Sequence, residues 1–181
     1  SAMTENDVLS FWFDQITPEQ WFVKDLEFDR LIITKFAHLH TAANQCELYA
    51  WRSTAKGRLA EIIVLDQFSR NMFRDSPQAF SSDALALVLA QEAISTGADK
   101  SLSSTERSFL YMPFMHSESL LIHQQALVLY TNNGIQSNLD FELQHKKIIE
   151  QFGRYPHRNK ILGRHSSEAE ITFLTQPGSA F

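Results

Sequence analysis

The segment that decides the fold spans residues 55–69 and reads AKGRLAEIIVLDQFS. Its apolar residues, Ile62 and Ile63 among them, recur at the spacing of an α-helix and define one apolar arc. The charged residues Arg58 and Glu61 are expected on the opposite, outer face. The pattern therefore predicts one helix over the whole segment.

Helical periodicity continues along most of the chain, and residues that favour helix ends separate the apolar runs. Thr4 with Asp7, and Ser167 with Glu170, have the spacing of capping boxes, and Asp25 is a further N-cap candidate. The expected helices span residues 4–13, 18–22, 25–43, 55–69, 82–97, 104–113, 117–130, 137–152, 156–163 and 167–177.

The order of these elements favours one fold class. The sequence shows no pair of strands joined by an Asn-Gly or Asp-Gly hairpin turn. Helices with short connections pack as antiparallel neighbours. We therefore predict an all-α fold, a stack of antiparallel helical hairpins, in a single domain over residues 3–181. Ser1 and Ala2, which precede Met3, are expected to be remnants of cloning.

The composition is typical of a packed globular protein. Hydrophobic residues make up 44% of the chain, and 14 Phe stand against 6 Gly and 5 Pro, which disfavours both disorder and a loop-rich β fold. The lone Cys46 has no partner for an intramolecular disulfide. No apolar run is long enough to cross a bilayer, so no membrane role is expected. We expect a cytoplasmic protein.

Charge is distributed unevenly along the chain. The net charge is −5, yet residues 145–165 carry six Lys or Arg against the single acid Glu150. The remaining ten bases face twenty acids, so nucleic acid is disfavoured as the main partner. The basic segment fits an anion-binding site, and it equally fits a solvated helix face.

Asp66 and Arg70 fall inside the apolar arc of the 55–69 helix. They are four residues apart with the acid first, which is the favourable order for a helical ion pair. Charged side chains are rare in a core unless they are paired, because removing each ion from water costs several kcal/mol. Two interpretations stay open: the pair ties two helices together, or Arg70 lines a pocket in which Asp66 orients it.

A basic stretch, QFGRYPHRNKILGR, occupies residues 151–164. A new helix is expected at Pro156, and its first amides lack helical partners. Together with Arg154, His157 and Arg158 they form a candidate cradle for a carboxylate or phosphate. Alternatively, the arginines cap helix carbonyls and stack on neighbouring aromatic rings. The pair Arg158 and Asn159 repeats the pair Arg70 and Asn71.

A third polar group lies in YMPFMHSES, residues 111–119, where His116 and Glu118 follow a proline. The histidine spacings match no metal motif, and no nucleophile or phosphate-loop motif is present, so neither a metal nor a cofactor is expected. General acid/base chemistry by His116 or His157 with Glu118 or Asp66 is one option.

The helix predicted over 137–152 carries a histidine on its apolar stripe. His145 shares the spacing of Ile148 and Ile149, whereas Glu142 is expected to face away. A single histidine on an apolar face is more often a hydrogen-bonded core residue than a ligand.

Several of these stretches resemble a bacterial family, the domain of unknown function 924. The resemblance covers nearly the whole chain and rests on VLSFWF (8–13), LDQFSRNMFR (65–74), YMPFMHSE (111–118), FGRYPHRN (152–159) and LGR (162–164). It implies a tetratricopeptide-like helical superhelix and no assigned activity. The family motifs contain the polar residues singled out above, namely Asp66, Gln67, Arg70, Asn71, His116, Glu118, Arg154, His157, Arg158 and Asn159.

We expect these ten residues to line a concave site for a small anionic ligand or an acidic peptide terminus. Arg154 and Arg158 are predicted to face Arg70 and His116. Whether the site only binds or also catalyses is left open. The alternative is a protein- or peptide-interaction module that uses a tetratricopeptide-like groove, and RNA binding is a more remote third possibility.

Overall fold

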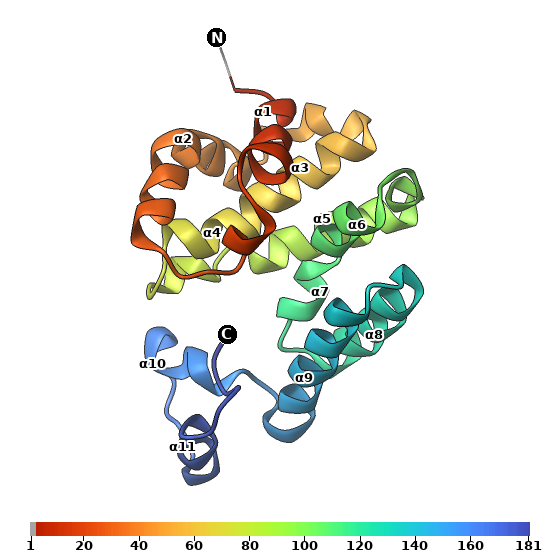
Figure 1. The fold of residues 1–181 in the computed structure, drawn as a ribbon. Coiled ribbons are helices and arrows are strands. Elements are labelled where there is room, and N and C mark those ends of the chain that lie inside the picture. Colours follow the sequence, from red (N-terminus) through yellow and green to blue (C-terminus); the bar gives the residue numbers. More distant parts are fainter. Residues whose placement is uncertain (1–2) are drawn as a thin grey trace.

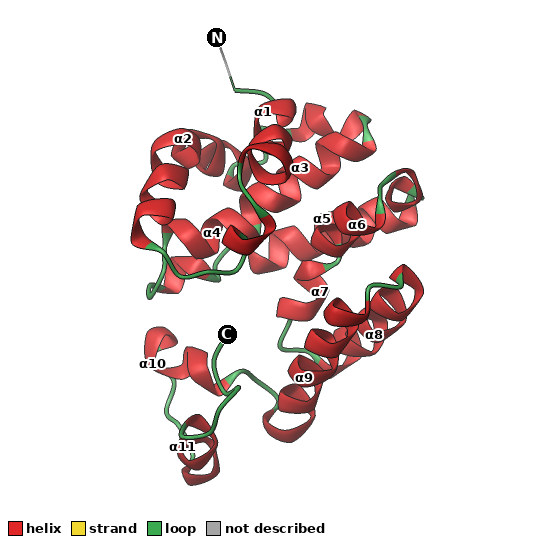
Figure 2. Cartoon of the chain, viewed as in Figure 1, coloured by secondary structure: helices red, strands yellow, loops and turns green. Residues whose placement is uncertain are grey.

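The structure is a computed structural model that describes residues 3–181. Within these residues it is all-α, without a single strand (Figures 1 and 2). Ser1 and Ala2, the expected cloning remnants, lie outside the described residues. The α-helices are α1 Glu5–Ser10, α2 Leu26–Asn44, α3 Ala55–Leu65, α4 Gln67–Met72, α5 Asp83–Ser95, α6 Ser104–Leu110, α7 Met112–His116, α8 Leu120–Asn133, α9 Gln136–Phe152, α10 Asn159–Leu162 and α11 Glu168–Leu174.

Shorter helical turns connect these helices. They are the π-helical turn η1 Phe11–Gln15 and the 3-10 turns η2 Pro18–Gln20, η3 Tyr49–Ser53, η4 Pro77–Ala79, η5 Ala98–Ser101 and η6 Pro156–Arg158. None of the described helices is both long and apolar enough to cross a membrane.

The predicted helix ends that depend on local chemistry are confirmed. Thr4 and Asp7 form the first capping box, and the Asp25 side chain accepts hydrogen bonds from two amides of α2. Ser167 and Glu170 form the last capping box. Each pair satisfies backbone donors that the first helical turn leaves free.

Other boundaries differ from the prediction. The helix expected after Thr17 begins at Pro18 as predicted, but it is a single 3-10 turn that ends at Gln20, so the prediction that it carries Trp21 and Phe22 is wrong. The N-cap of α8 is Ser119, two residues after the predicted Ser117, whereas α6 begins at Ser104 as predicted.

The helix predicted over 55–69 is interrupted at Asp66, which separates α3 from α4. Asp66 is the N-cap residue of α4, and Arg70 Nη1 donates to its carbonyl at 3.2 Å. The turn therefore brings the Asp66 backbone and side chain to the same arginine.

α3 is the central helix of the molecule and packs against α1, α2, α5 and α6. Every residue from Leu59 to Leu65 is buried, so α3 has no solvated outer face along this stretch. The prediction that Glu61 faces outward is wrong, because Glu61 is 1% exposed and binds Arg52 through two hydrogen bonds of 2.8 and 2.7 Å.

α9, α10 and α11 lie together at one end of the molecule, and α1 to α4 at the other (Figure 1). α9 pairs with α8, and its C-terminal half joins a small apolar cluster of Ile148, Ile149 and Tyr155. The tetratricopeptide-like superhelix and the single domain over 3–181 stay predictions.

Candidate functional site

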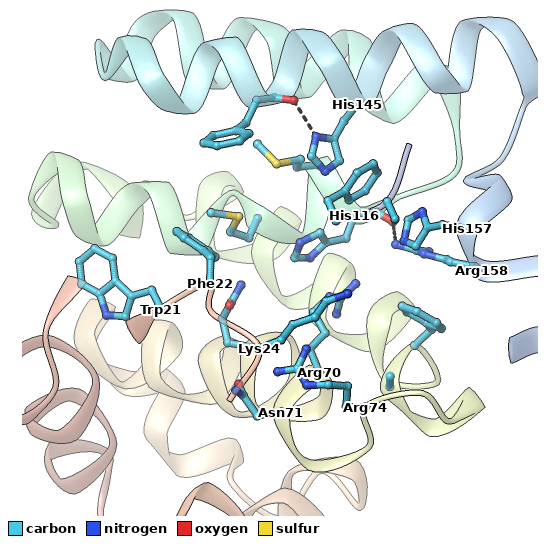
Figure 3. Close-up of a pocket in the computed structure, with 18 of the residues that line it drawn as sticks. Trp21, Phe22, Lys24, Arg70, Asn71, Arg74, His116, His145, His157 and Arg158 are labelled. Carbon is cyan, nitrogen blue, oxygen red and sulfur yellow. Dashed lines mark hydrogen bonds between the residues drawn. The ribbon is translucent and has the colours of Figure 1, made fainter. Parts of the chain in front are cut away.

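A cavity of about 510 Å³ lies between these two ends of the molecule. Arg70 and Arg74 enter it from α4 and the following loop, and His157 and Arg158 enter from the C-terminal region on the other side (Figure 3). With Lys24, the lining carries four Lys or Arg residues against one acid, Asp75. The rest of the lining is largely apolar or aromatic, with Trp21, Phe22, Ala79, Phe80, Met112, Met115, Phe141, Ile161, Ala180 and Phe181.

Asp66 lies behind the cavity wall and holds two of the lining residues in place. Its carboxylate is fully buried and accepts hydrogen bonds from His116 Nδ1 at 2.7 Å and from Arg70 Nη1 at 3.2 Å. Gln67 Nε2 also donates to it, at 3.1 Å. Burial opposes the charge of Asp66, but His116 and Arg70 beside it lower the pKa of the carboxyl group. The predicted contact between Asp66 and Arg70 is confirmed.

Burial and the nearby Arg70 lower the pKa of His116, so its imidazole is neutral at pH 7. Because Nδ1 faces a carboxylate, the proton lies on Nδ1 and Nε2 keeps its lone pair. Nε2 makes no hydrogen bond to the described residues and is not sealed from solvent. His116 therefore offers the cavity a proton acceptor that a carboxylate holds in place.

Arg70 is held by two carboxylates from different helices. Its guanidinium binds Asp83, the first residue of α5, through two hydrogen bonds of 2.9 and 3.0 Å. Burial works against the charge, yet Asp83 and Asp66 raise the pKa of Arg70. These bonds fix the guanidinium at the cavity wall.

Arg158 is less well paired than Arg70. It is 5% exposed, and its guanidinium lies over the rings of Phe80 and Tyr155, at 4.4 and 4.7 Å from their centroids. Nη2 donates to the His116 carbonyl at 3.0 Å, Nε has no partner, and Asp83 approaches only to 3.9 Å. Burial and the neighbouring Arg70 lower the pKa of Arg158.

Gln67 and Asn71 line the cavity from α4, as their place beside Asp66 and Arg70 suggested. Asn71 Nδ2 donates to Asp29 at 2.9 Å, and Arg74 binds the same carboxylate through two bonds of 2.8 and 3.0 Å. The amide of Asn71 is thereby held against α2.

His157 and His145 contribute flat, neutral rings. Burial and the adjacent Arg158 lower the pKa of His157 to about 4, and its Nδ1 has no hydrogen-bond partner. Burial lowers the pKa of His145 to about 3, and its Nδ1 bonds to the Phe141 carbonyl at 2.6 Å. Both histidines line the cavity.

Four of the predicted site residues lie outside the cavity lining: Asp66, which holds Arg70 and His116 from behind, and Glu118, Arg154 and Asn159, which make other contacts. Arg154 binds Glu170 through bonds of 2.9 and 2.7 Å, so the prediction that Arg154 faces Arg70 is wrong. Asn159 also donates to Glu170, at 3.3 Å, which ties α10 to α11. Glu118 accepts two bonds from Arg164 and one from the Tyr155 amide. Arg154 precedes η6 and Arg158 is its last residue, and the two arginines serve different surfaces.

Sequence reasoning missed several residues that build the site. Asp83 lies 13 residues from Arg70, and no local signal pairs the two. Lys24, Phe80 and Phe181 lie outside the family motifs, and no periodicity points to them. Their role follows only from the tertiary arrangement.

The prediction that Glu142 faces away from the core is also wrong. Glu142 is fully buried, and its Oε2 lies 2.8 Å from His123 Nδ1. Burial raises the pKa of Glu142 despite this contact. His123 Nε2 continues the network to the Ser117 carbonyl at 2.6 Å and the Tyr155 hydroxyl at 2.9 Å. Across residues 3–181, no three His, Cys, Asp or Glu side chains are grouped so as to hold a metal ion.

Comparisons with known proteins agree with this fold. A solved structure of a protein of unknown function from Agrobacterium tumefaciens is 38% identical, with a TM-score of 0.89 over 94% of this chain and 96% of that one. Comparison with curated proteins gave no match. Residues 8–178 match the model of a family described as "Bacterial protein of unknown function (DUF924)". The chain therefore belongs to this bacterial family, the one that its sequence motifs resemble.

Proposed function

We propose that the cavity binds a small organic molecule through a phosphate or carboxylate group. The observation that carries this proposal is Arg158, a guanidinium that is 5% exposed and whose Nε has no partner. A buried cation with unfilled donors is costly, because hydrogen bonds to water have been lost and not replaced. An anion in the cavity would supply the missing acceptors.

The surroundings of Arg158 support an anion as the missing partner. Arg70 lies close enough to lower the pKa of Arg158, which means that the two cations repel each other. The carboxylates of Asp66 and Asp83 are already engaged by Arg70. A planar carboxylate or a phosphate suits the fork geometry of a guanidinium and would relieve this repulsion.

The size and lining of the cavity fit a small molecule. A volume of about 510 Å³ falls in the range of ligand pockets, roughly 300 to 1,000 Å³. Such pockets are mostly apolar with a few well-placed polar groups, which matches the aromatic residues and the three arginines here.

Acid/base chemistry on the bound anion is part of the proposal. His116 is neutral, its Nδ1 is anchored to Asp66, and its Nε2 has no protein partner. A base in this state accepts a proton from a bound molecule or from water.

We also propose a cytoplasmic location, which fits a chain with a single free cysteine.

Titration calorimetry and thermal unfolding with inorganic phosphate, sulfate and acetate test the proposal. A ligand at 100 times its Kd should stabilise the protein by about 2.7 kcal/mol. Arg158→Met should raise the Kd of the anion at least tenfold and reduce the stabilisation accordingly. Arg154→Met is the matched control, because Arg154 lies on the same segment but binds Glu170 outside the cavity. Equal anion affinity in all three proteins would refute the proposal.

A second candidate function is peptide binding, and one observation favours it. Phe181, a residue of this chain, lines the cavity and packs on His145, so the site already contacts an aromatic side chain carried by a polypeptide. Fluorescence polarisation with an acidic peptide that contains phenylalanine tests this function. Tight peptide binding without any binding of small anions would make the interaction module the leading function.

A further inference from the structure

Beside the arginines, the cavity has a second part built from flat rings. The ring centroid of Phe181 lies 3.9 Å from that of His145 and 4.5 Å from that of His157. Tyr155 does not line the cavity; it is fully buried behind this group, with its ring 5.2 Å from that of Phe181. We call the three rings of His145, Tyr155 and His157 the ring subsite.

The ring subsite is uncharged near neutral pH. The pKa values of His145 and His157 are about 3 and about 4, mainly because both side chains are buried, so their imidazoles present neutral faces. Aromatic faces and edges at centroid separations of 4.5 to 7 Å attract a further ring. The ring subsite therefore suits a flat apolar group rather than a charged one.

Phe181 occupies the ring subsite without being firmly held there. Its side chain is 45% exposed. Within the described chain, residues 179–181 make a single side-chain hydrogen bond, from Ser179 Oγ to the Leu174 carbonyl at 3.2 Å. A group with more contact area can therefore displace the Phe181 ring at small cost.

The ring subsite and the cationic part of the cavity share one wall. The Tyr155 ring contacts Arg158 at 4.7 Å on one side and Phe181 at 5.2 Å on the other. His157 and Arg158 are also consecutive residues of η6. A ligand that fills both parts must therefore carry its ring and its anionic group close together.

We infer that the ligand of this cavity is a small aryl anion, a flat ring joined by a short spacer to a carboxylate or phosphate, and that Phe181 holds the place of its ring when the ligand is absent. The inference rests on the proposed function for its anionic half. Its aromatic half rests on the observed position of Phe181, which is a separate observation.

Calorimetry with four probes tests the inference: phenyl phosphate, phenylacetate, inorganic phosphate and acetate. Each aryl probe should bind the wild-type protein more tightly than its parent anion. Phe181→Ala should tighten the aryl probes by about tenfold, if the ring subsite is about 90% occupied by Phe181, and should leave inorganic phosphate unchanged. The stronger of the two aryl probes identifies the anionic group as phosphate or carboxylate.

Phe173→Ala is the matched control, because Phe173 lies on α11 and packs against Phe152 at 5.0 Å, outside the cavity. It should leave all four affinities unchanged. A second measurement follows the ring of Phe181 by NMR in the wild-type protein. Its signals should move toward those of an exposed phenylalanine as phenyl phosphate is added.

The outcomes separate this inference from the proposed function. Binding of inorganic phosphate that depends on Arg158, with no gain for phenyl phosphate in wild type or Phe181→Ala, would overturn the aryl class and leave the proposed function standing. Failure of all four probes to bind would overturn both. Tightening of inorganic phosphate by Phe181→Ala to the same degree would show that Phe181 merely obstructs the cavity, which also overturns the inference.

Discussion

The regions before and after the start of α9 are held together by different interactions. Before α9, one apolar cluster extends from Val8 to Tyr130 and contains fully buried rings such as those of Phe36 and Phe68. From α9 onward, the apolar cluster has only three buried members, Ile148, Ile149 and Tyr155. The first region has a large core of its own, and the second does not.

Beyond the packing of α9 on α8, the C-terminal region is fastened to the first by charged hydrogen bonds. Arg164 donates two bonds to Glu118, at 2.9 and 3.0 Å, and Arg158 donates to the His116 carbonyl at 3.0 Å. Such bonds are directional, so they set the distance between the regions without filling the space between them. The cavity lies where apolar packing gives way to these bonds, which explains why its wall is both aromatic and cationic.

The largest expected effect is on the apolar region. Phe68→Ala should lower the free energy of unfolding by about 3 to 5 kcal/mol, because Phe68 is fully buried and stacks on Phe36 at 4.8 Å. Urea denaturation followed by circular dichroism measures the loss. Val88→Ala, at a side chain 57% exposed, should change it by less than about 0.5 kcal/mol. A loss below about 1 kcal/mol for Phe68→Ala would contradict the contrast between the regions.

The second largest effect is expected for Asp66→Ala, which should lower the free energy of unfolding by about 3 kcal/mol. The substitution leaves Arg70 and His116 without their shared buried acceptor. The loss lies at the lower end for buried pairs because Arg70 keeps Asp83. Asp66→Asn, which retains an acceptor oxygen, should lose less. Equal stability of Asp66→Ala and wild type in urea would mean that the cluster is not a structural anchor.

Arg164→Met should destabilise by about 2 kcal/mol, the scale of a few partly exposed hydrogen bonds to a charged group. The loss should be local, so amides of α10 and α11 should exchange hydrogen faster while those of α3 remain protected. Arg30→Met, at an exposed position of α2, is the control and should change neither the free energy of unfolding nor the hydrogen exchange of these amides. Uniform acceleration across both regions would argue for one cooperative unit.

Acid should weaken the C-terminal region through His145 and His157. Their folded pKa values, about 3 and about 4, lie below the usual 6.5 because of burial, so the unfolded chain binds more protons below pH 6.5. Stability should therefore be complete above pH 6.5 and fall as the pH drops toward 4, by up to about 1.4 kcal/mol per pH unit for each histidine. His157→Gln should flatten this slope in urea titrations between pH 7.5 and 5. If the slope of the unfolding free energy against pH is unchanged in His157→Gln, then the His157 side chain is in contact with water in the folded protein.

Features of the fold that depend on residues close in sequence could be predicted, whereas those that depend on tertiary packing could not. Helix caps such as Thr4 with Asp7, and Ser167 with Glu170, depend on residues three apart, and those predictions hold. The burial of Glu61 could not be read from periodicity, because a helix packed on all sides has no outer face. A pairing with Arg52 across a turn satisfies its charge.

The candidate site was predictable to a similar extent. Asp66 and Arg70 share one turn of chain, so their contact follows from spacing. Arg154 and Arg158 look equivalent in sequence, and only the path of η6 directs one to Glu170 and the other to the cavity. The part played by Phe181 depends on a contact with His145 across 36 residues, which no local pattern encodes.

The central claim is that the two regions build one anion site, with Arg70 from α4 and Arg158 from η6. A double-mutant cycle with Arg70→Lys and Arg158→Lys tests it most directly, because lysine keeps the charge but loses the guanidinium fork, so that weakened binding stays measurable. Inorganic phosphate is titrated into wild type, both single variants and the double variant. If one phosphate contacts both arginines, the losses should be non-additive by at least about 0.5 kcal/mol. Strictly additive losses, or unchanged affinity in all four proteins, would contradict a site shared between the two regions.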